Sequence, residues 1–413
     1  MFVFKIFEFG EELHGATFHI LLNKILKKEY SEQWMEAKCE LDNIHWIEET
    51  PINKPIREKV MYQRYNKYFE DGNIDGVEIQ MDIIEKNRLY KWDFCSESRW
   101  SKIGVIIPEL FFLDSKKEMT DFFNKSRFAS HPITEILEHN NDVNDQYNKT
   151  SVLFGKRVYV KPSGFSVYGA GNFNFGNNSG NMINIYHNFT LDNLKMEYDK
   201  LESGKNIILQ SSVENMMFYN NRKFDIRFHV LFLLYNEELY VFSHEYNYFR
   251  LTVNEYNDSS EELANFITNY NYQKKNDNFK AEKCQLMTYL LPKYDVIHEN
   301  IKNVVIELSK ILVNEIKFNK CGDDNKRKPQ LWFTGFDFII DNDLKPWLIE
   351  INHNPGFLTP YPKDKYEQIN LNGIYSLIGY FLTPILEGKP ISKENQGVFN
   401  FLYCSKVYFN DVF

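Results

Sequence analysis

The sequence contains few cysteines, and they are widely spaced. The 413 residues include five cysteines, none of them in a C-x-x-C pair: Cys39, Cys95, Cys284, Cys321 and Cys404. This spacing argues against a zinc site or a disulfide framework and is typical of a reducing compartment. We therefore expect a cytoplasmic protein.

Long hydrophobic runs are also absent. A membrane-spanning helix needs roughly 18 or more apolar residues, and no such stretch occurs, so we expect no transmembrane helix. The N-terminus has acidic residues soon after its apolar start and lacks the pattern of a secretory signal. The chain also has no GxGxxG loop followed by a VAIK-like lysine and an HRD segment, which argues against a kinase.

The balance of charge is acidic, at a formal net charge of −9. Bulk attraction to nucleic acid is therefore not expected, and an acidic protein partner would need a local basic patch. One candidate patch is the run Lys326-Arg327-Lys328, with Lys317 and Lys320 nearby. Such a run is also typical of a solvated loop. We expect a monomer with no nucleic-acid or membrane partner.

Length and periodicity indicate an α/β protein of two or three lobes, taking roughly 100–200 residues per domain. Apolar alternation and apolar runs predict strands over 2–9, 103–107, 157–160, 206–210, 225–235 and 238–243. Helical patterns cover 16–28, 116–128 and 190–203, and 259–317 is charged and helix-prone. The stretches 139–150 and 164–180 are polar, and we expect loops there.

A hairpin near the C-terminal end carries the most informative acidic residues. Residues 331–341 and 345–351 are predicted strands, with Asp341-Asn342-Asp343 in the turn. Alternation separates Phe336, Phe338 and Ile340 from Asp337, and a hairpin of this length brings Asp337 close to Glu350 and Asn352. Acids on an otherwise apolar sheet are costly unless they are paired or bind a cation. Oxygen ligands without His or Cys favour magnesium over zinc. A solvent-facing acidic hairpin is the alternative.

The segment 222–228, RKFDIRF, alternates charged and apolar residues. In a strand, Lys223, Asp225 and Arg227 share one face while the aromatic residues face a core. Such a face suits an anionic ligand, because arginine can bind phosphate through two hydrogen bonds and lysine supplies a compact charge. A surface strand with ion pairs would show the same pattern.

Two further segments gain meaning only beside these two. In VYVKPSG, Lys161 ends a strand before a Gly-rich loop, where backbone amides can approach phosphates closely. In ILQSSVE, an apolar strand runs into a polar segment that could hold adenine through its backbone. Each pattern alone is common.

The order of these motifs resembles the tubulin–tyrosine ligase-like family of ATP-grasp enzymes. The matching segments lie between about residues 155 and 353: VYVKPSG, ILQSSVE, RKFDIRFHVL, YFRLT, FITNYNYQK and GFDFIID…WLIEIN. Upstream, Asn124-Lys125 and His131-Pro132 resemble the start of an ATP-grasp module, which adds Lys125 to the nucleotide-binding candidates. The first 115 residues resemble the family's N-terminal lobe only weakly.

The resemblance implies a role for each matched position. It implies ATP contacts for Lys161, Gln210, Ser211, Val213, Lys223 and Asp225, and magnesium ligation by Asp337, Glu350 and Asn352. Arg227 would stabilise phosphates or an acyl-phosphate. The incoming amino acid would be surrounded by Arg250, Thr268, Asn269 and Lys274, with Arg250 on its carboxylate.

The implied fold is an ATP-grasp fold of the α/β class, with ATP between two antiparallel sheets. We expect an N-terminal lobe over 1–115, a central lobe over 116–205 and a C-terminal lobe over 206–413. This chain departs from the family at Ser211-Ser212, in the long Asn-rich loop 164–180 and at His353-Asn354. These departures concern the substrate more than the fold.

The implied activity is an ATP- and Mg²⁺-dependent ligase that forms an amide between an amino acid and a protein carboxylate through an acyl-phosphate. Glutamate, tyrosine and glycine are all candidate amino acids, and a tubulin tail is a candidate acceptor. Two alternatives stay open, namely a ligase acting on a small peptide or metabolite and a non-catalytic ATP-grasp scaffold.

Overall fold

The computed structural model describes residues 107–139, 143–163, 183–201, 206–318, 329–353, 372–373 and 375–409. It also describes the backbone of a three-stranded parallel sheet of order β2-β1-β3, formed by β1 (Phe2–Phe7), β2 (Trp34–Glu36) and β3 (Trp46–Glu49). The strand expected over 2–9 is thus confirmed for 2–7. The helix expected over 16–28, the loop 164–180 and the basic run 326–328 lie outside the described residues.

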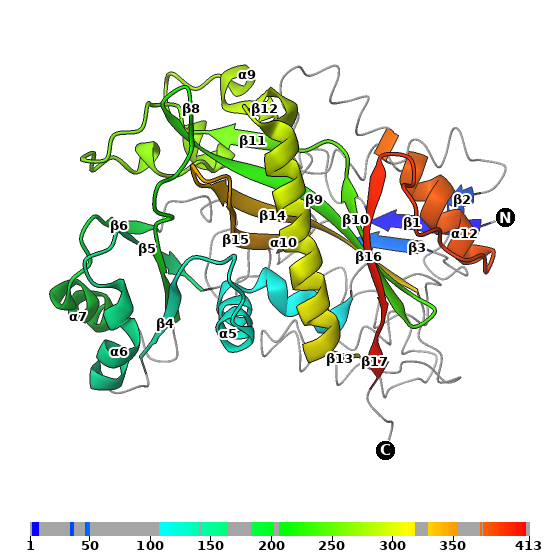
Figure 1. Ribbon diagram of the computed structural model, residues 1–413, viewed down its shortest axis with the longest axis horizontal. Coiled ribbons are helices and arrows are strands. Elements are labelled where there is room, and N and C mark those ends of the chain that lie inside the picture. Colours follow the sequence, from blue (N-terminus) through cyan, green and yellow to red (C-terminus); the bar gives the residue numbers. More distant parts are fainter. Residues whose placement is uncertain are drawn as a thin grey trace, which may run out of the picture.

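A large antiparallel sheet organises most of the chain (Figure 1). Its longest strand is β9 (Arg222–Tyr235), and the others are β8 (Phe218–Tyr219), β10 (Glu238–His244), β11 (Tyr248–Leu251), β12 (Gln285–Met287), β14 (Gln330–Ile340), β15 (Pro346–His353) and β16 (Phe399–Lys406). One edge of β9 pairs with β14. The other edge pairs with β11 over residues 224–227 and with β10 over 230–235, so β9 has two halves with different neighbours.

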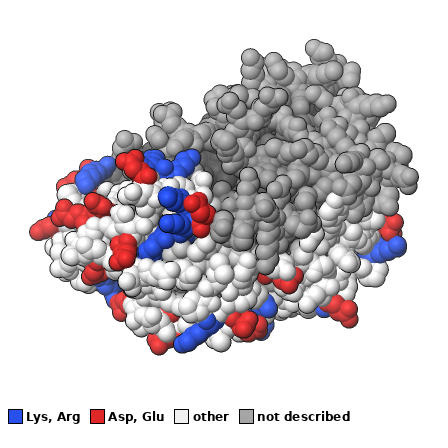
Figure 2. All heavy atoms as spheres, turned by 90° about the horizontal axis from the view of Figure 1, so that it is seen from above, with Lys and Arg blue, Asp and Glu red and all other residues white. Residues whose placement is uncertain are grey.

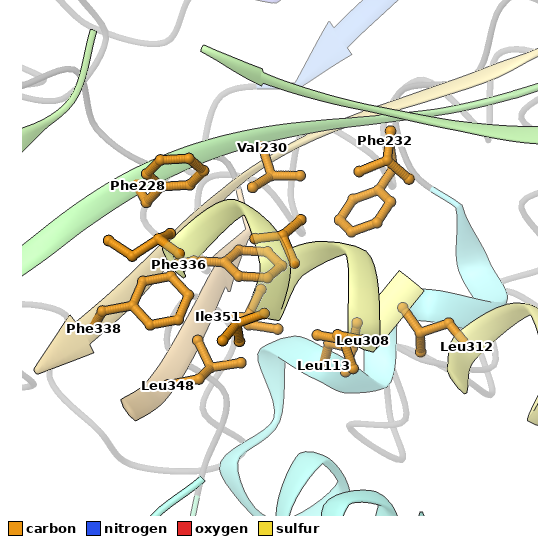
Figure 3. Packing of buried hydrophobic residues seen from close by; sticks show 14 of the residues in the cluster. Leu113, Phe228, Val230, Phe232, Leu308, Leu312, Phe336, Phe338, Leu348 and Ile351 are labelled. Atoms are coloured by element: carbon orange, nitrogen blue, oxygen red, sulfur yellow. The ribbon is translucent and has the colours of Figure 1, made fainter. Parts of the chain in front are cut away.

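The main core lies between one face of this sheet and the long helix α10 (Tyr294–Glu315), which crosses the sheet in Figure 1. Even-numbered residues of β9 from Phe224 to Leu234 are all in this core, as period-two alternation requires. Helix α10 contributes Ile297, Ile301, Leu308 and Leu312, spaced four or seven residues apart on one helical stripe. Figure 3 shows its Leu308 and Leu312 beside the side chains of β9, β14 and β15.

A smaller antiparallel sheet of order β4-β7-β5-β6 carries its own core. Its strands are β4 (Thr134–Glu138), β5 (Val158–Pro162), β6 (Asn184–Tyr186) and β7 (Asn206–Ser211). Three helical segments accompany it, α6 (Val143–Thr150), η3 (Ser151–Leu153) and α7 (Leu191–Asp199). Thr190 and Asn193 form a capping box that begins α7.

Two segments precede the small sheet, η2 (Pro108–Asp114) and α5 (Lys116–Ser126), and both contribute to the main core. The opposite face of the large sheet is covered at the β10–β16 end by η6 (Ile378–Leu382) and α12 (Thr383–Leu386). The remaining elements are short, namely η4 (Leu263–Asn265), α8 (Tyr270–Gln273), α9 (Ala281–Cys284), η5 (Thr288–Leu290), β13 (Lys317–Phe318) and β17 (Tyr408–Phe409).

The α/β class and the antiparallel sheets expected from the sequence are confirmed, as are the final hairpin and the strands expected over 157–160, 206–210, 225–235 and 238–243. The strand expected over 103–107 lies outside the described residues except for residue 107. One expectation was wrong. The polar stretch 139–150 contains α6, because Gln146 and Thr150 provide a buried side even though the helix has few apolar residues. The helix-prone character of 259–317 is confirmed by the short helices α8 and α9 and the long helix α10, with the strand β12 among them.

The lobe boundaries remain a prediction. The boundary expected at 205/206 falls inside the small sheet, because β7 begins at Asn206 and pairs with both β4 and β5. Among the described residues, no helix is both long and apolar enough to cross a bilayer.

Candidate functional site

The odd-numbered face of β9, opposite the main core, is charged over its first half. Lys223, Asp225 and Arg227 lie two residues apart on this face, as their spacing predicted, and all three are buried. Antiparallel register places Arg250 of β11 opposite Asp225, and Asp337 of β14 opposite Arg227. Residues directly opposite each other project to the same side, so three strands contribute to one charged cluster.

Two arginines and two aspartates form the centre of this cluster. Arg250 donates from Nε and Nη2 to the two carboxylate oxygens of Asp225, at 2.7 and 2.6 Å. Arg227 donates from Nε and Nη2 to the two oxygens of Asp337, and Arg250 Nη2 lies 2.9 Å from Asp337 Oδ2. Burial opposes the charge on Arg250, but Asp225 and Asp337 outweigh it and raise its pKa well above the ordinary value. Such bidentate pairing keeps buried charges compensated.

The final hairpin adds a carboxylate and an amide to the same face. Asp337 and Glu350 are opposite each other, and a bulge follows because Phe338 pairs with Leu348 and leaves Ile349 unpaired. Asn352 Nδ2 lies 3.2 Å from Asp337 Oδ2 and 3.3 Å from Glu350 Oε1. The convergence of these three side chains, inferred from spacing alone, is therefore confirmed as geometry.

Lys116 is a member of the cluster that sequence reasoning missed. It is the first residue of α5, and its Nζ lies 3.4 Å from Glu350 Oε2. Burial raises the pKa of Glu350, but Lys116 and Lys161 outweigh this and hold the pKa well below its usual range. A lysine in the first turn of a helix opposes the helix dipole, which was the available signal that it has a carboxylate partner.

The small sheet presents Lys161 and Gln210 toward this cluster. Lys161 Nζ donates to Gln210 Oε1 at 2.6 Å. Burial lowers the pKa of Lys161 to about 8, and the neighbouring cations Lys116 and Lys223 add to this against the opposing effect of Glu350. The two sheets also meet directly, since Lys223 Nζ donates to the Tyr159 hydroxyl at 2.9 Å. Tyr159 was not among the sequence-based candidates.

The segment expected to hold adenine lies at the end of β7. Ser211 and Val213 are buried. The amide of Ser211 donates to the Ile133 carbonyl, and the amide of Ser212 donates to the Arg157 carbonyl. These two amides are therefore engaged in the protein, and a nucleotide base would rely on other groups of the segment.

The remaining candidates divide into two groups. Thr268 joins the cluster by donating to Asp225 Oδ2 at 2.7 Å. Asn269 accepts from the Tyr272 amide and so supports the start of α8. Lys125 and Lys274 are exposed, and among the described residues no hydrogen bond or ion pair joins their side chains to the cluster.

The donor set fits magnesium better than a soft metal. In the described part of the chain, no group of three or more His, Cys, Asp and Glu side chains is arranged to hold a metal ion. Two carboxylates and one amide are the hard oxygen donors that magnesium uses together with water and phosphates. Asp337 is already bound by Arg227 and Arg250, so the oxygens of Glu350 and Asn352 are more available to ligate magnesium. Rotating the Asn352 amide would turn its oxygen toward the same point.

Comparison with known proteins matches the region that carries this cluster. Residues 180–370 match the profile of the Tubulin-tyrosine ligase family. A probable beta-tubulin polyglutamylase of Tetrahymena thermophila is 27% identical over 206 residues, which cover 43% of this chain and 17% of that protein. The tubulin polyglutamylase TTLL6 of Mus musculus is 28% identical over 40% of this chain and 22% of its own length.

A third relative carries a different name. The tubulin glycylase 3B of Tetrahymena thermophila is 33% identical over 160 residues, covering 36% of this chain and 13% of that protein. The matched segment thus spans only about a fifth of the first two relatives. Most residues of the charged cluster described above lie inside the segment from residue 180 to residue 370, which is similar to the tubulin-tyrosine ligase family.

Proposed function

We propose that this chain is an ATP- and magnesium-dependent ligase that joins an amino acid to a carboxylate of a protein. The observation that carries the proposal is the surroundings of Glu350, which pairs with Lys116, is stabilised electrostatically by Lys161 and lies beside Asp337 and Asn352. Carboxylates and cations concentrated at one buried point suit a metal-bound triphosphate, whose negative charge both can bind.

In this proposal, nucleotide lies between the two sheets. Lys161, Gln210, Ser211, Val213 and Lys223 would contact ATP, while Glu350 and Asn352, supported by Asp337, would hold magnesium. Magnesium would neutralise negative charge on the phosphates. The protein mainly positions reactants and supplies preorganised charge, so no protein nucleophile is required.

The chemistry follows in two balanced steps. A carboxylate oxygen of the acceptor attacks the γ-phosphorus of ATP, the bond to the β,γ-bridging oxygen breaks, and ADP leaves. The amine of the amino acid then attacks the acyl-phosphate carbon, inorganic phosphate leaves, and the amine loses a proton as the amide forms. Arg227 would stabilise the phosphoryl charge. Enclosure of the site would protect the acyl-phosphate from hydrolysis.

Arg250 is the proposed ligand of the amino acid's own carboxylate. Its Nε and Nη2 groups bind Asp225. An incoming carboxylate would therefore be bound by Nη1, with Thr268 close by because it shares Asp225. Substitution of Arg250 would for that reason disturb both Asp225 and the amino acid.

Relatives named as polyglutamylases and a glycylase make glutamate the first amino acid to test and glycine the second. Their names also make a tubulin tail the first acceptor to test, which would place the reaction in the cytoplasm. Figure 2 shows acidic and basic side chains intermingled on the described surface in that view. An acidic tail would therefore be recognised near the cluster rather than by a broad basic surface there.

The test is mass spectrometry of tubulin and of carboxylate-bearing peptides after incubation with ATP, magnesium and pooled amino acids. The added mass would identify the amino acid and the acceptor together. Glu350→Gln should lower amino-acid-dependent ADP release by more than about 100-fold, since even outer-shell changes cost about 10- to 100-fold at metal sites. Glu307→Gln is the matched control, because Glu307 is exposed on α10.

Equal turnover of Glu350→Gln and wild type would rule out the metal assignment. Turnover with a small peptide or metabolite, but with no protein acceptor, would favour the alternative of a ligase that acts on small molecules. Tight nucleotide binding without any turnover would favour a scaffold.

A further inference from the structure

Strand β15, which carries Glu350 and pairs with β14, also forms hydrogen bonds with the segment between α5 and β4. The amide of Leu348 donates to the Ser130 carbonyl at 2.7 Å, and His131 Nδ1 lies 2.7 Å from the Leu348 carbonyl oxygen. Lys345 Nζ adds a contact of 3.2 Å to the Ala129 carbonyl. Residues 129–131 therefore fix β15 at its bulge, two residues before Glu350.

His131 makes this contact as a neutral donor. A carbonyl oxygen can only accept, so the proton lies on Nδ1. The ring is buried, and Nε2 has no hydrogen-bond partner among the residues that the structure describes. Burial lowers the pKa of His131 to about 4, so the imidazole is uncharged near neutral pH. The hydrogen bond to Leu348 is thus the polar role visible for this side chain.

The same segment leads by hydrogen bonds to Lys161. Thr134 Oγ1 donates to the Pro132 carbonyl at 2.8 Å and accepts from Gln210 Nε2 at 3.2 Å. Gln210 Oε1 in turn accepts from Lys161 Nζ at 2.6 Å. A connected path therefore runs from Leu348 through His131, the peptide of Pro132, Thr134 and Gln210 to Lys161.

We infer that His131 is a positioning residue that sets the distance between Lys161 on the small sheet and Glu350 on the large sheet. The inference rests on the proposed function, in which these two side chains lie on opposite sides of the magnesium-bound triphosphate. His131 touches neither reactant. It acts because the bulge at Ile349 leaves β15 without regular pairing at that point, and the segment 129–131 supplies the missing support.

The test separates the Nδ1 hydrogen bond from the bulk of the ring. His131→Asn places an amide donor near the Nδ1 position, whereas His131→Gln places it near Nε2. Binding of Mn²⁺ in the presence of a non-hydrolysable ATP analogue is measured by electron paramagnetic resonance, and thermal unfolding is measured in parallel. His131→Asn should bind Mn²⁺ within about twofold of wild type, and His131→Gln should bind about tenfold more weakly at a similar unfolding temperature.

A second pair of variants tests the same hydrogen-bonded path at Thr134, where valine has nearly the shape of threonine. Thr134→Val removes the hydroxyl that links Pro132 to Gln210, and Thr134→Ser retains it. Thr134→Val should weaken Mn²⁺ binding severalfold and Thr134→Ser should not. In the double variant, His131→Gln with Thr134→Val, the losses should be less than multiplicative because both break one path.

Equal Mn²⁺ affinity in His131→Asn and His131→Gln, or multiplicative losses in the double variant, would overturn the inference. Wild-type protein that binds neither Mn²⁺ nor nucleotide would instead refute the proposed function. The two failures are therefore distinguishable.

Discussion

The two halves of β9 are both buried on the face away from the main core, but one carries charged side chains and the other apolar ones. On the face away from the main core, the first half carries Lys223, Asp225 and Arg227, and the second half carries Leu231 and Leu233. The first half pairs with β11 and contributes to the charged cluster, whereas the second half pairs with β10 and packs beneath η6 and α12. One strand thus passes from a charged site into an apolar core within a few residues.

This difference indicates that the apolar half serves mainly the stability of the fold and the charged half mainly the binding of a ligand. An apolar face gains free energy when it is buried, whereas buried ion pairs are often no better for stability than apolar residues of similar volume. The charged half of β9 is therefore poorly explained by folding alone. Its cost is understandable if the charges bind a ligand, and the halves should respond differently to substitution.

The largest expected effect is the loss of stability when one partner of the charged half is removed. Asp337→Ala would leave Arg227 without its carboxylate and Arg250 with only Asp225. We expect the free energy of unfolding to fall by about 3–5 kcal/mol, because the change leaves a buried guanidinium unpaired. Chemical denaturation would measure it.

The double variant Arg227→Met with Asp337→Leu is the informative control. It removes both charges, so it should cost less stability than Asp337→Ala while still abolishing nucleotide binding. A double variant that is less stable than Asp337→Ala would show that this pair is a net source of stability, against the comparison drawn above.

A substitution in the apolar half of β9 should lower stability without changing nucleotide affinity. Leu231→Ala removes a fully buried side chain from the core beneath α12 and should lower the free energy of unfolding by about 2–4 kcal/mol. Nucleotide affinity, measured by calorimetry at a temperature where the variant is folded, should stay within about twofold of wild type. A large loss of affinity would mean that the site extends along the whole strand.

Much of this comparison was predictable from local pattern. Alternation alone separated Asp225 and Arg227 from Ile226 and Phe228, because a strand has a period of two. The turn at Asp341 likewise implied that Asp337 and Glu350 lie together, because a short hairpin determines its own register. The sequence did not predict direct contact between the acids of the hairpin and the cations of β9. They lie on adjacent strands and touch, since Arg227 binds Asp337 directly.

What local pattern could not predict depends on contacts between distant parts of the chain. Lys116 and Glu350 are 234 residues apart in sequence, and His131 and Leu348 are 217 residues apart. The residues that neighbour Lys116 and His131 in the sequence do not specify which strand each side chain will contact. Helix α6 was missed for a related reason, since its buried side is polar and gives no apolar period.

A smaller effect is expected on the pH dependence of nucleotide affinity, through Lys161 of β5, which faces the charged cluster. Its pKa is lowered to about 8 from a usual value of 10.5, so its positive charge is present at pH 7 and lost as the pH rises through 8. If Lys161 binds phosphate, nucleotide affinity should fall by up to about tenfold between pH 7 and pH 9. Lys161→Arg, which stays charged, should show a flatter profile in the same calorimetric titration. Parallel profiles for the two proteins would exclude Lys161 as the titrating group.

The smallest expected effect is on the pH dependence of stability, and it comes from a histidine at the boundary between the two halves of β9. His229 of β9 and His244 of β10 lie there with ring centroids 6.2 Å apart, and His244 Nδ1 lies 2.8 Å from the Tyr246 carbonyl oxygen. Burial lowers the pKa of His244 to about 4, from 6.5. The unfolded chain therefore binds a proton near pH 6.5 that the folded chain does not, and stability falls as the pH drops below that value.

For this one group the loss is about 1 kcal/mol at pH 5.5, relative to pH 7.5. His244→Asn can keep a donor toward Tyr246 but cannot titrate. Its free energy of unfolding, measured by denaturation at both pH values, should therefore drop by about 1 kcal/mol less than that of wild type. Identical drops would mean that His244 titrates normally in the folded protein. The boundary would then be hydrated, and the charged half of β9 would extend further toward the C-terminal core than its burial indicates.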